Sequence, residues 1–230
     1  MATIYLIRHG QASFGEENYD QLSATGWQQA KVLGQWMADR VRPDVVIGGN
    51  MKRHRETVEA LASGYRRSSF PDMQVAEGFN EFDHVAVMHN YRPQWRDHAV
   101  MKAELDASGN PAKAFQETFV KAVQRWVSGD HDVDYPETWS GFKHRVQRSF
   151  DDLVSWADGG EVFVSTSGGP IAVMVQSLLG ISDSHALGLN NVIANTSVTR
   201  VLYSGQRRSL AVFNNYSHLE AEDPALVTFR

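Results

Sequence analysis

Residues 4–13 read IYLIRHGQAS, an apolar run that ends in an arginine, a histidine and a glycine. The β-branched and apolar side chains from Thr3 to Ile7 predict a short strand that is buried on both faces. Arg8 would offer a planar fork matched to phosphate oxygens, and His9 an unprotonated nitrogen that can attack phosphorus. Gly10 has no side chain to keep a ligand away from the main chain. The stretch therefore predicts a buried strand whose carboxyl end carries either an anion site or a salt bridge beside a solvated histidine.

Buried strands and helices alternate along the rest of the chain. Strands are predicted over 44–49, 74–77, 161–169, 197–204 and 209–215, the last two as a hairpin through Gly205, and helices over 25–41, 52–63, 138–157 and 170–180. This order predicts an α/β fold, a three-layer α/β/α sandwich with a mostly parallel central sheet. Ligands of such sheets bind at the carboxyl ends of the strands. Arg8-His9-Gly10, Gly48-Gly49-Asn50 and Ser167-Gly168-Gly169 stand at such ends, and they meet only if their strands are neighbours.

Residues 84–135 differ from this pattern. They carry Trp95, Trp126 and two or three amphipathic segments, but no convincing strand. We expect a helical insertion that caps one end of the sheet, within a single domain spanning residues 1–230. Phe14, Phe82, Tyr91, Trp95 and Arg92 are candidates for lining a substrate pocket, although Trp95 fits the core of the insertion better.

Composition limits the possible functions. The net charge of −5 gives no general attraction to nucleic acid or to an acidic membrane surface. The chain has no cysteine, which excludes disulfides and thiolate catalysis, and no apolar run approaches the ~18 residues of a membrane span. The N-terminus lacks a basic stretch followed by an apolar core, so a cytoplasmic enzyme or binding protein is the default expectation. With this net charge, a small phosphorylated substrate would have to be drawn by a local positive pocket. The remaining histidines show no compact metal-ligand spacing, and neither a metal nor a cofactor is expected.

The motifs resemble those of the histidine phosphatase superfamily, the phosphoglycerate-mutase-like proteins. The opening segment and its continuation YDQLSATGWQQAKVLGQWM are similar to that family's start, and GGNMKRHRETVEAL is similar to its Ser-Ser-x-x-x-Arg-Ala-x-x-Thr-Ala segment. Further matches follow in order: FNEF (79–82), PETWSGFKHRV (136–146), VFVSTSGGPIAVM (162–174) and NNYSHL (214–219). The resemblance covers essentially the whole chain, and 84–135 is the least matched part.

The resemblance implies a role for each site residue. His9 would accept the phosphoryl group, while Arg8 and Arg53 would hold its oxygens. Glu81 would protonate the leaving alcohol and then accept a proton from water, with Glu77 and Asp83 as alternative proton donors. The resemblance also places Gly10, Gln11, Ser167 and Gly168 among the substrate-binding positions.

Ser167 departs from the family pattern, which has a second catalytic histidine there. Loss of one charge-assisted hydrogen bond predicts a rate lower by roughly ten- to a hundredfold, and a Ser167→His variant is expected to keep or raise turnover. His84 is the nearest replacement by register, whereas His54 is expected to be solvated on its helix. Gly48-Gly49 stands where the family has serines, and Gly15 where mutases place an asparagine.

These features predict a metal-independent phosphatase that hydrolyses a phosphomonoester through a phosphohistidine on His9, with reduced activity as an option. One alternative is a catalytically retired family member that binds a phosphorylated ligand or partner. A lesser alternative is a phosphoglycerate-type mutase, against which the missing asparagine at position 15 argues.

Overall fold

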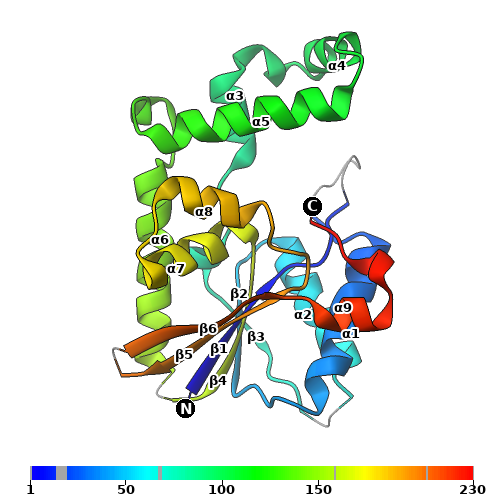
Figure 1. Ribbon diagram of the computed structural model, residues 1–230, viewed down its shortest axis with the longest axis vertical. Helices are drawn as coiled ribbons and strands as arrows, with labels where there is room; N and C mark the ends of the chain where they lie inside the picture. The colour runs from blue at the N-terminus through cyan, green and yellow to red at the C-terminus, as the bar shows by residue number, and fades with distance from the viewer. Residues whose placement is uncertain (1, 14–19, 67–68, 158, 206, 230) are drawn as a thin grey trace. The chain divides into compact units, whose positions relative to one another are not determined.

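A single mixed sheet organises the chain. The computed structural model describes residues 2–13, 20–66, 69–157, 159–205 and 207–229, and within them six strands pair in the order β3-β2-β4-β1-β5-β6 (Figure 1). The strands are β1 Ala2–Arg8, β2 Val45–Gly48, β3 Met73–Val75, β4 Glu161–Thr166, β5 Val198–Ser204 and β6 Arg207–Asn215. Strands β3, β2, β4 and β1 pair in parallel, whereas β5 and β6 pair antiparallel. The predicted α/β class with a mostly parallel sheet is confirmed.

Helices cover the sheet. They are α1 Ala24–Ala38, α2 Lys52–Gly64, α6 Trp139–Trp156, α7 Gly168–Leu179, α8 Asp183–Asn190 and α9 Ser217–Glu222. Alternate residues of β1 point to opposite faces: Tyr5 and Ile7 pack with Leu33 of α1 and Leu61 of α2 in one buried cluster. Helix α7 lies against β1 and β6, and Figure 1 shows α1 and α2 on the other side of the sheet.

Two glycines bring α1 and α2 into backbone contact. A Cβ added at Gly34 would lie 2.0 Å from the carbonyl oxygen of Leu61, and one added at Gly64 would lie 2.1 Å from that of Lys31. Any larger residue would push the helices apart. The position of α2 over the sheet therefore depends on these two residues.

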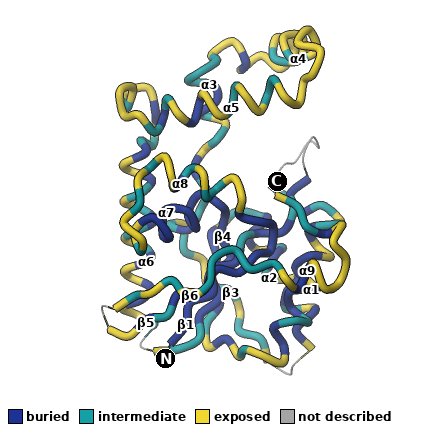
Figure 2. The backbone as a smooth tube through the Cα atoms, viewed as in Figure 1, coloured by how far each residue is buried: buried dark blue, intermediate teal, exposed yellow. Residues whose placement is uncertain are grey.

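The chain divides into two compact units, Met1–Glu81 with Val146–Arg230, and Phe82–Arg145. The second unit holds α3 His84–Tyr91, α4 His98–Ala107, α5 Pro111–Ser128 and the start of α6, which confirms the helical nature of the insertion. Phe82 stacks on Trp126 with 4.8 Å between ring centroids, and Trp95 is 2% exposed. Figure 2 shows buried stretches within α3 and α5 beside the exposed residues of the same helices. Both aromatic side chains therefore belong to the unit's own core. The cap over the sheet and the single domain remain predictions.

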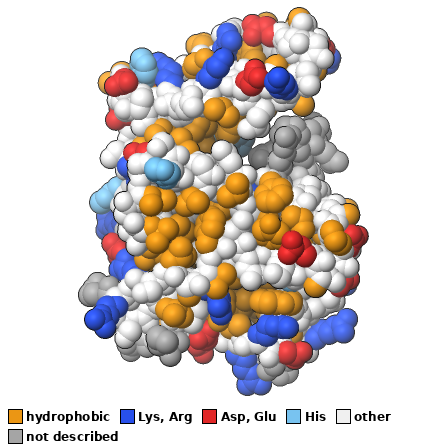
Figure 3. Space-filling model, viewed as in Figure 1, with side chains coloured by type: hydrophobic (Ala, Val, Ile, Leu, Met, Phe, Trp, Pro, Cys, Tyr) orange, Lys and Arg blue, Asp and Glu red, His pale blue; other side chains and the backbone are white. Residues whose placement is uncertain are grey.

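The surface carries both charged and apolar side chains. In Figure 3, hydrophobic side chains gather over the region of α7 and α8, and acidic and basic side chains are interspersed around them. Leu179 at the end of α7 is 54% exposed. Among the described residues, no helix is both long enough and apolar enough to cross a membrane.

Candidate active site

Three strand ends meet at one edge of the sheet. Strand β4 lies between β1 and β2, with Thr166 opposite Arg8 and Ser165 opposite Gly48. Because these strands run parallel, their carboxyl ends lie side by side. The segments that follow β1, β2 and β4 are therefore neighbours. Their meeting depends on this strand order, which the sequence does not show.

His9 is held as a neutral ring. Its main-chain N–H donates to the carbonyl oxygen of Thr166 at 2.8 Å, and its Nδ1 lies 2.7 Å from the carbonyl oxygen of Gly10. A carbonyl only accepts hydrogen bonds, so Nδ1 carries the proton. Burial, followed by the positive charges of Arg53 and Arg8, holds the pKa of His9 well below its ordinary value. Nε2 therefore keeps its lone pair at neutral pH.

Thr57 ties this histidine to helix α2. The Thr57 hydroxyl accepts from the Gly10 N–H at 3.0 Å and donates to the carbonyl oxygen of Arg53 at 2.7 Å. A Cβ on Gly10 would lie 2.5 Å from the carbonyl oxygen of Gly26, so the missing side chain admits helix α1. In the structure Gly10 thus serves packing and positioning, a different physical reason from the one the sequence suggested.

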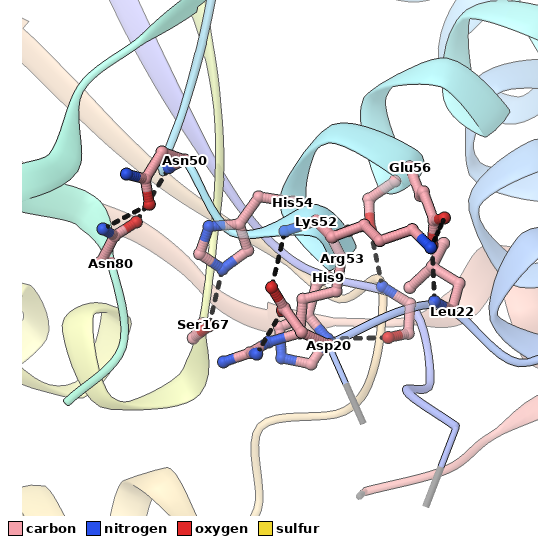
Figure 4. Close-up of polar contacts among 12 residues, drawn as sticks. His9, Asp20, Leu22, Asn50, Lys52, Arg53, His54, Glu56, Asn80 and Ser167 are labelled. Atoms are coloured by element: carbon pink, nitrogen blue, oxygen red, sulfur yellow. Dashed lines mark hydrogen bonds and ion pairs between the residues drawn. The ribbon is translucent and has the colours of Figure 1, made fainter. Parts of the chain in front are cut away.

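Both predicted guanidinium groups lie near His9. Arg53 is 3% exposed, and its Nη1 pairs with Oδ1 of Asp20 at 2.7 Å (Figure 4). Asp20 also accepts from the Lys52 N–H at 2.9 Å, which caps the start of α2. The Nη1 of Arg8 donates to the carbonyl oxygens of Ile193 and Phe229. The two arginines therefore bring positive charge to His9, one from the end of β1 and the other from the start of α2.

The side chain of Glu81 contacts the first turn of helix α7. Its Oε2 accepts from the Gly169 N–H at 3.1 Å. The residues before it are fixed by two contacts: the Thr166 hydroxyl donates to the Phe79 carbonyl oxygen at 2.6 Å, and the Asn80 amide pairs with Asn50 at 2.8 Å (Figure 4).

The two alternative carboxylates have other contacts. Glu77 accepts from the Asn50 amide at 2.7 Å, and Asp83 accepts from the Ala86 N–H at 2.9 Å, which caps α3. Glu81, in contrast, contacts the helix that follows β4, and the choice among the three carboxylates stays a prediction.

The other predicted binding residues contact the protein itself. The Gln11 N–H donates to Gln29 Oε1 at 2.8 Å, and Gln11 Oε1 accepts from the Ser23 hydroxyl at 2.8 Å. A Cβ on Gly168 would lie 2.3 Å from Oδ1 of Asn190, so this glycine lets α8 approach α7. Phe14 and Gly15 lie outside the described residues.

His54 is a site residue that the sequence analysis missed. It is fully buried, its Nε2 lies 2.7 Å from the Ser167 hydroxyl oxygen, and its ring centroid lies 5.8 Å from that of His9 (Figure 4). The expectation of a solvated side chain was therefore wrong. Helical spacing carried a signal: His54 stands three residues before Thr57 and seven before Leu61, both on the buried face of α2.

A protein-family model matches most of the sequence. The model of the histidine phosphatase superfamily (branch 1) matches residues 4–129 and 105–216. The chain belongs to the histidine phosphatase superfamily.

Solved structures share this superfamily fold. Bacillus stearothermophilus YhfR aligns with a TM-score of 0.69 at 18% identity, covering 95% of this chain and 100% of that one. A phosphoglycerate mutase from Bacillus anthracis gives 0.65 at 17% identity, with 95% of each chain covered. A mutant phosphoserine phosphatase from Entamoeba histolytica, in complex with phosphoserine, gives 0.64 at 16%, covering 95% and 100%. No curated protein sequence matches the chain.

The histidine that contacts Ser167 is not the one that register favoured. His84, the replacement favoured by register, begins α3 in the second unit, whereas His54 is the histidine that contacts Ser167. Within the described part of this superfamily member, no group of three or more His, Asp or Glu side chains is arranged to hold a metal ion.

Proposed function

We propose that this protein is a metal-independent phosphatase that hydrolyses a phosphomonoester through a phosphohistidine on His9. The observation that carries the proposal is the bond from His9 Nδ1 to the Gly10 carbonyl oxygen, at 2.7 Å in a buried ring. It fixes the tautomer in which Nε2 is the nucleophilic atom. The lowered pKa of His9, caused by burial and then by Arg53 and Arg8, keeps that atom unprotonated.

In the first step, Nε2 of His9 bonds to phosphorus as the bond from phosphorus to the ester oxygen breaks. Glu81 gives its proton to the departing oxygen, so the alcohol leaves neutral. The charges of Arg53 and Arg8 stabilise the oxygens of the transferred group, where negative charge accumulates. Asp20, which pairs with Arg53 here, would compete with the phosphoryl group for that guanidinium.

In the second step, water attacks phosphorus and the bond from Nε2 to phosphorus breaks. The Glu81 carboxylate accepts the proton that the water loses. The net reaction converts ester and water into alcohol and phosphate, and both His9 and Glu81 return to their starting states. The contact between Glu81 and Gly169 supports this role, because it holds the carboxylate at the same strand edge as His9.

The similar proteins support phosphoryl chemistry without choosing a substrate. Their titles name a phosphoserine phosphatase, a putative α-ribazole-5′-phosphate phosphatase from Escherichia coli and a phosphoglycerate mutase. We favour hydrolysis over mutase chemistry, since Gly15 stands where mutases place an asparagine.

Incubation with a generic phosphate ester tests the proposal. We expect release of inorganic phosphate and acid-labile phosphate on the protein, both lost in His9→Ala. His144→Ala, which changes an exposed histidine on α6, is the matched control and should behave as wild type.

The other outcomes separate the alternatives. Phosphate binding without phosphoenzyme or hydrolysis would favour the retired family member. Phosphoenzyme that passes its group to a phosphoglycerate but not to water would favour the mutase.

A further inference from the structure

His54 and Ser167 form a buried pair beside the proposed nucleophile. Both side chains are fully buried, and His54 Nε2 lies 2.7 Å from Ser167 Oγ. Ser167 follows β4 directly, and the main chain of His9 is bonded to the last residue of that strand. The pair therefore lies next to His9, and nothing in the proposed steps has used it.

The hydrogen-bond pattern of His54 indicates its tautomer. Burial, and then the charge of Arg53, holds the pKa of His54 well below its ordinary value, so the ring is neutral and carries one N–H. Among the described residues, its buried Nδ1 has no hydrogen-bond partner. An unpaired buried N–H is costly, which favours the proton on Nε2, where it is donated to Ser167 Oγ. The Ser167 hydroxyl is then left with its own proton to donate.

The Ser167 side chain does not cap helix α7. Ser167 occupies the N-cap position of α7, where a serine ordinarily accepts a main-chain N–H of the first turn. Within the described residues, Ser167 makes no such bond, and the Gly169 N–H is taken by Glu81 instead. The hydroxyl is thus directed at His54 and not at its own helix.

Gly49 makes room for the imidazole. A Cβ on Gly49 would lie 2.4 Å from Nδ1 of His54, so only glycine fits with the ring in place. Gly49, His54 and Ser167 are three positions at which the chain departs from the motifs it resembles, where serine, alanine and histidine stand. Although far apart in sequence, they form one contact group in the structure.

We propose that His54 positions the Ser167 hydroxyl so that it donates a hydrogen bond to the phosphoryl group carried by His9. This inference rests on the proposed function. The two side chains then do together what one histidine at position 167 would do alone. His54 is a positioning residue in this arrangement, since Ser167 alone touches the phosphoryl group.

A double-mutant cycle tests the pairing. His54→Ala and Ser167→Ala are each expected to lower kcat/KM roughly ten- to a hundredfold. The double variant should lose no more than Ser167→Ala alone, because His54 acts only through that hydroxyl. His54→Gln keeps an N–H donor at similar reach and should recover part of the loss. Losses that multiply, or an unchanged kcat/KM in His54→Ala, would overturn the proposal.

A swap of the two residues gives a second test. With His54 Nε2 only 2.7 Å from Ser167 Oγ, a second imidazole does not fit beside the first. Ser167→His alone is therefore expected to lose turnover, which revises the expectation from sequence. Ser167→His combined with His54→Ala should restore it, while His218→Gln, a change at a buried histidine that contacts Thr196, should leave kcat/KM unchanged. Full activity of Ser167→His alone would contradict the pairing.

The inference and the proposed function can fail separately. Wild-type protein that forms no phosphohistidine would refute the phosphatase. The pair is then tested by calorimetry with inorganic phosphate, whose affinity His54→Ala and Ser167→Ala should lower without their effects multiplying. Equal affinity in wild type and both variants would overturn the inference.

Discussion

Single residues at this site serve both structure and chemistry. Thr57 is fully buried, and its hydroxyl joins the Gly10 N–H to the Arg53 carbonyl oxygen. It thereby sets the distance between the nucleophile's loop and the helix that brings Arg53 and His54. Burial, and then the charge of Arg53, lowers the pKa of both His9 and His54.

Thr57→Val should lower both the free energy of unfolding and kcat/KM. Valine has the same shape but leaves the buried Gly10 N–H without its acceptor, at a cost of about 1–3 kcal/mol in the free energy of unfolding. Thr118→Val is the matched control, since Thr118 makes the same bond back to its own helix, to Ala114 at 2.8 Å. Urea unfolding and kcat/KM are measured for both. Equal effects of the two substitutions would show that the hydrogen bond from the Gly10 N–H contributes nothing specific to stability or to kcat/KM.

At the scale of elements, the position of α2 links packing to the site. Helix α2 carries Arg53, His54 and Thr57, and it lies against α1 through Gly34 and Gly64. A substitution in the contact between α1 and α2, far from His9, should therefore change the position of Arg53, His54 and Thr57 and lower turnover.

Gly34→Ala should lower both stability and turnover. The added Cβ would lie 2.0 Å from a backbone oxygen, which cannot move without shifting α2, and overpacking of this kind costs about 1–3 kcal/mol. Gly188→Ala in α8 meets nothing within 4 Å, so it should be neutral or stabilise by up to ~1 kcal/mol. Thermal unfolding and steady-state kinetics compare the two. A Gly34→Ala variant as stable and active as wild type would refute the close helix contact.

Elements with strong periodicity were predictable, and short ones were not. Strand β1, helix α2 and the hairpin of β5 and β6 follow from apolar spacing and a glycine turn. Helix α8, Asp183–Asn190, and helix α9, Ser217–Glu222, were missed, because a helix of two turns carries too few residues to show a period. His54 was misjudged because its basic neighbours in KRHR suggested solvent, whereas its register with Thr57 placed it inside.

At the scale of the whole molecule, strand order decides whether the motifs form a site. The residues after β1, β2 and β4 were visible in the sequence, but their meeting depended on β4 lying between the other two. No local pattern encodes that order. The contact of Gly49, His54 and Ser167 was hidden for the same reason, since it joins the ends of β2 and β4 with the start of α2.

Buried neutral histidines should make stability depend on pH. Burial lowers the pKa of His218 to about 4, whereas the unfolded chain keeps the ordinary value of 6.5. The unfolded state thus binds the proton first, so the stability present above pH 6.5 falls as the pH drops toward 4, by about 3 kcal/mol for this residue. His9 and His54 act in the same direction.

Urea unfolding at pH 7 and pH 4.5 measures this effect. The free energy of unfolding should fall less steeply in His218→Gln than in wild type, because the variant has lost one of the titrating groups. All carboxylates are common to both proteins, so the difference isolates the histidine. An identical pH dependence would show that the pKa of His218 is the same in the folded and unfolded states.

The central claim is that Nε2 of His9 carries the phosphoryl group. Rapid quenching during turnover, followed by mass spectrometry of the peptides under conditions that preserve phosphohistidine, locates that group directly. The account predicts acid-labile, alkali-stable phosphate on His9. Acid-stable phosphate on Ser167, with His54 as its base, would contradict it.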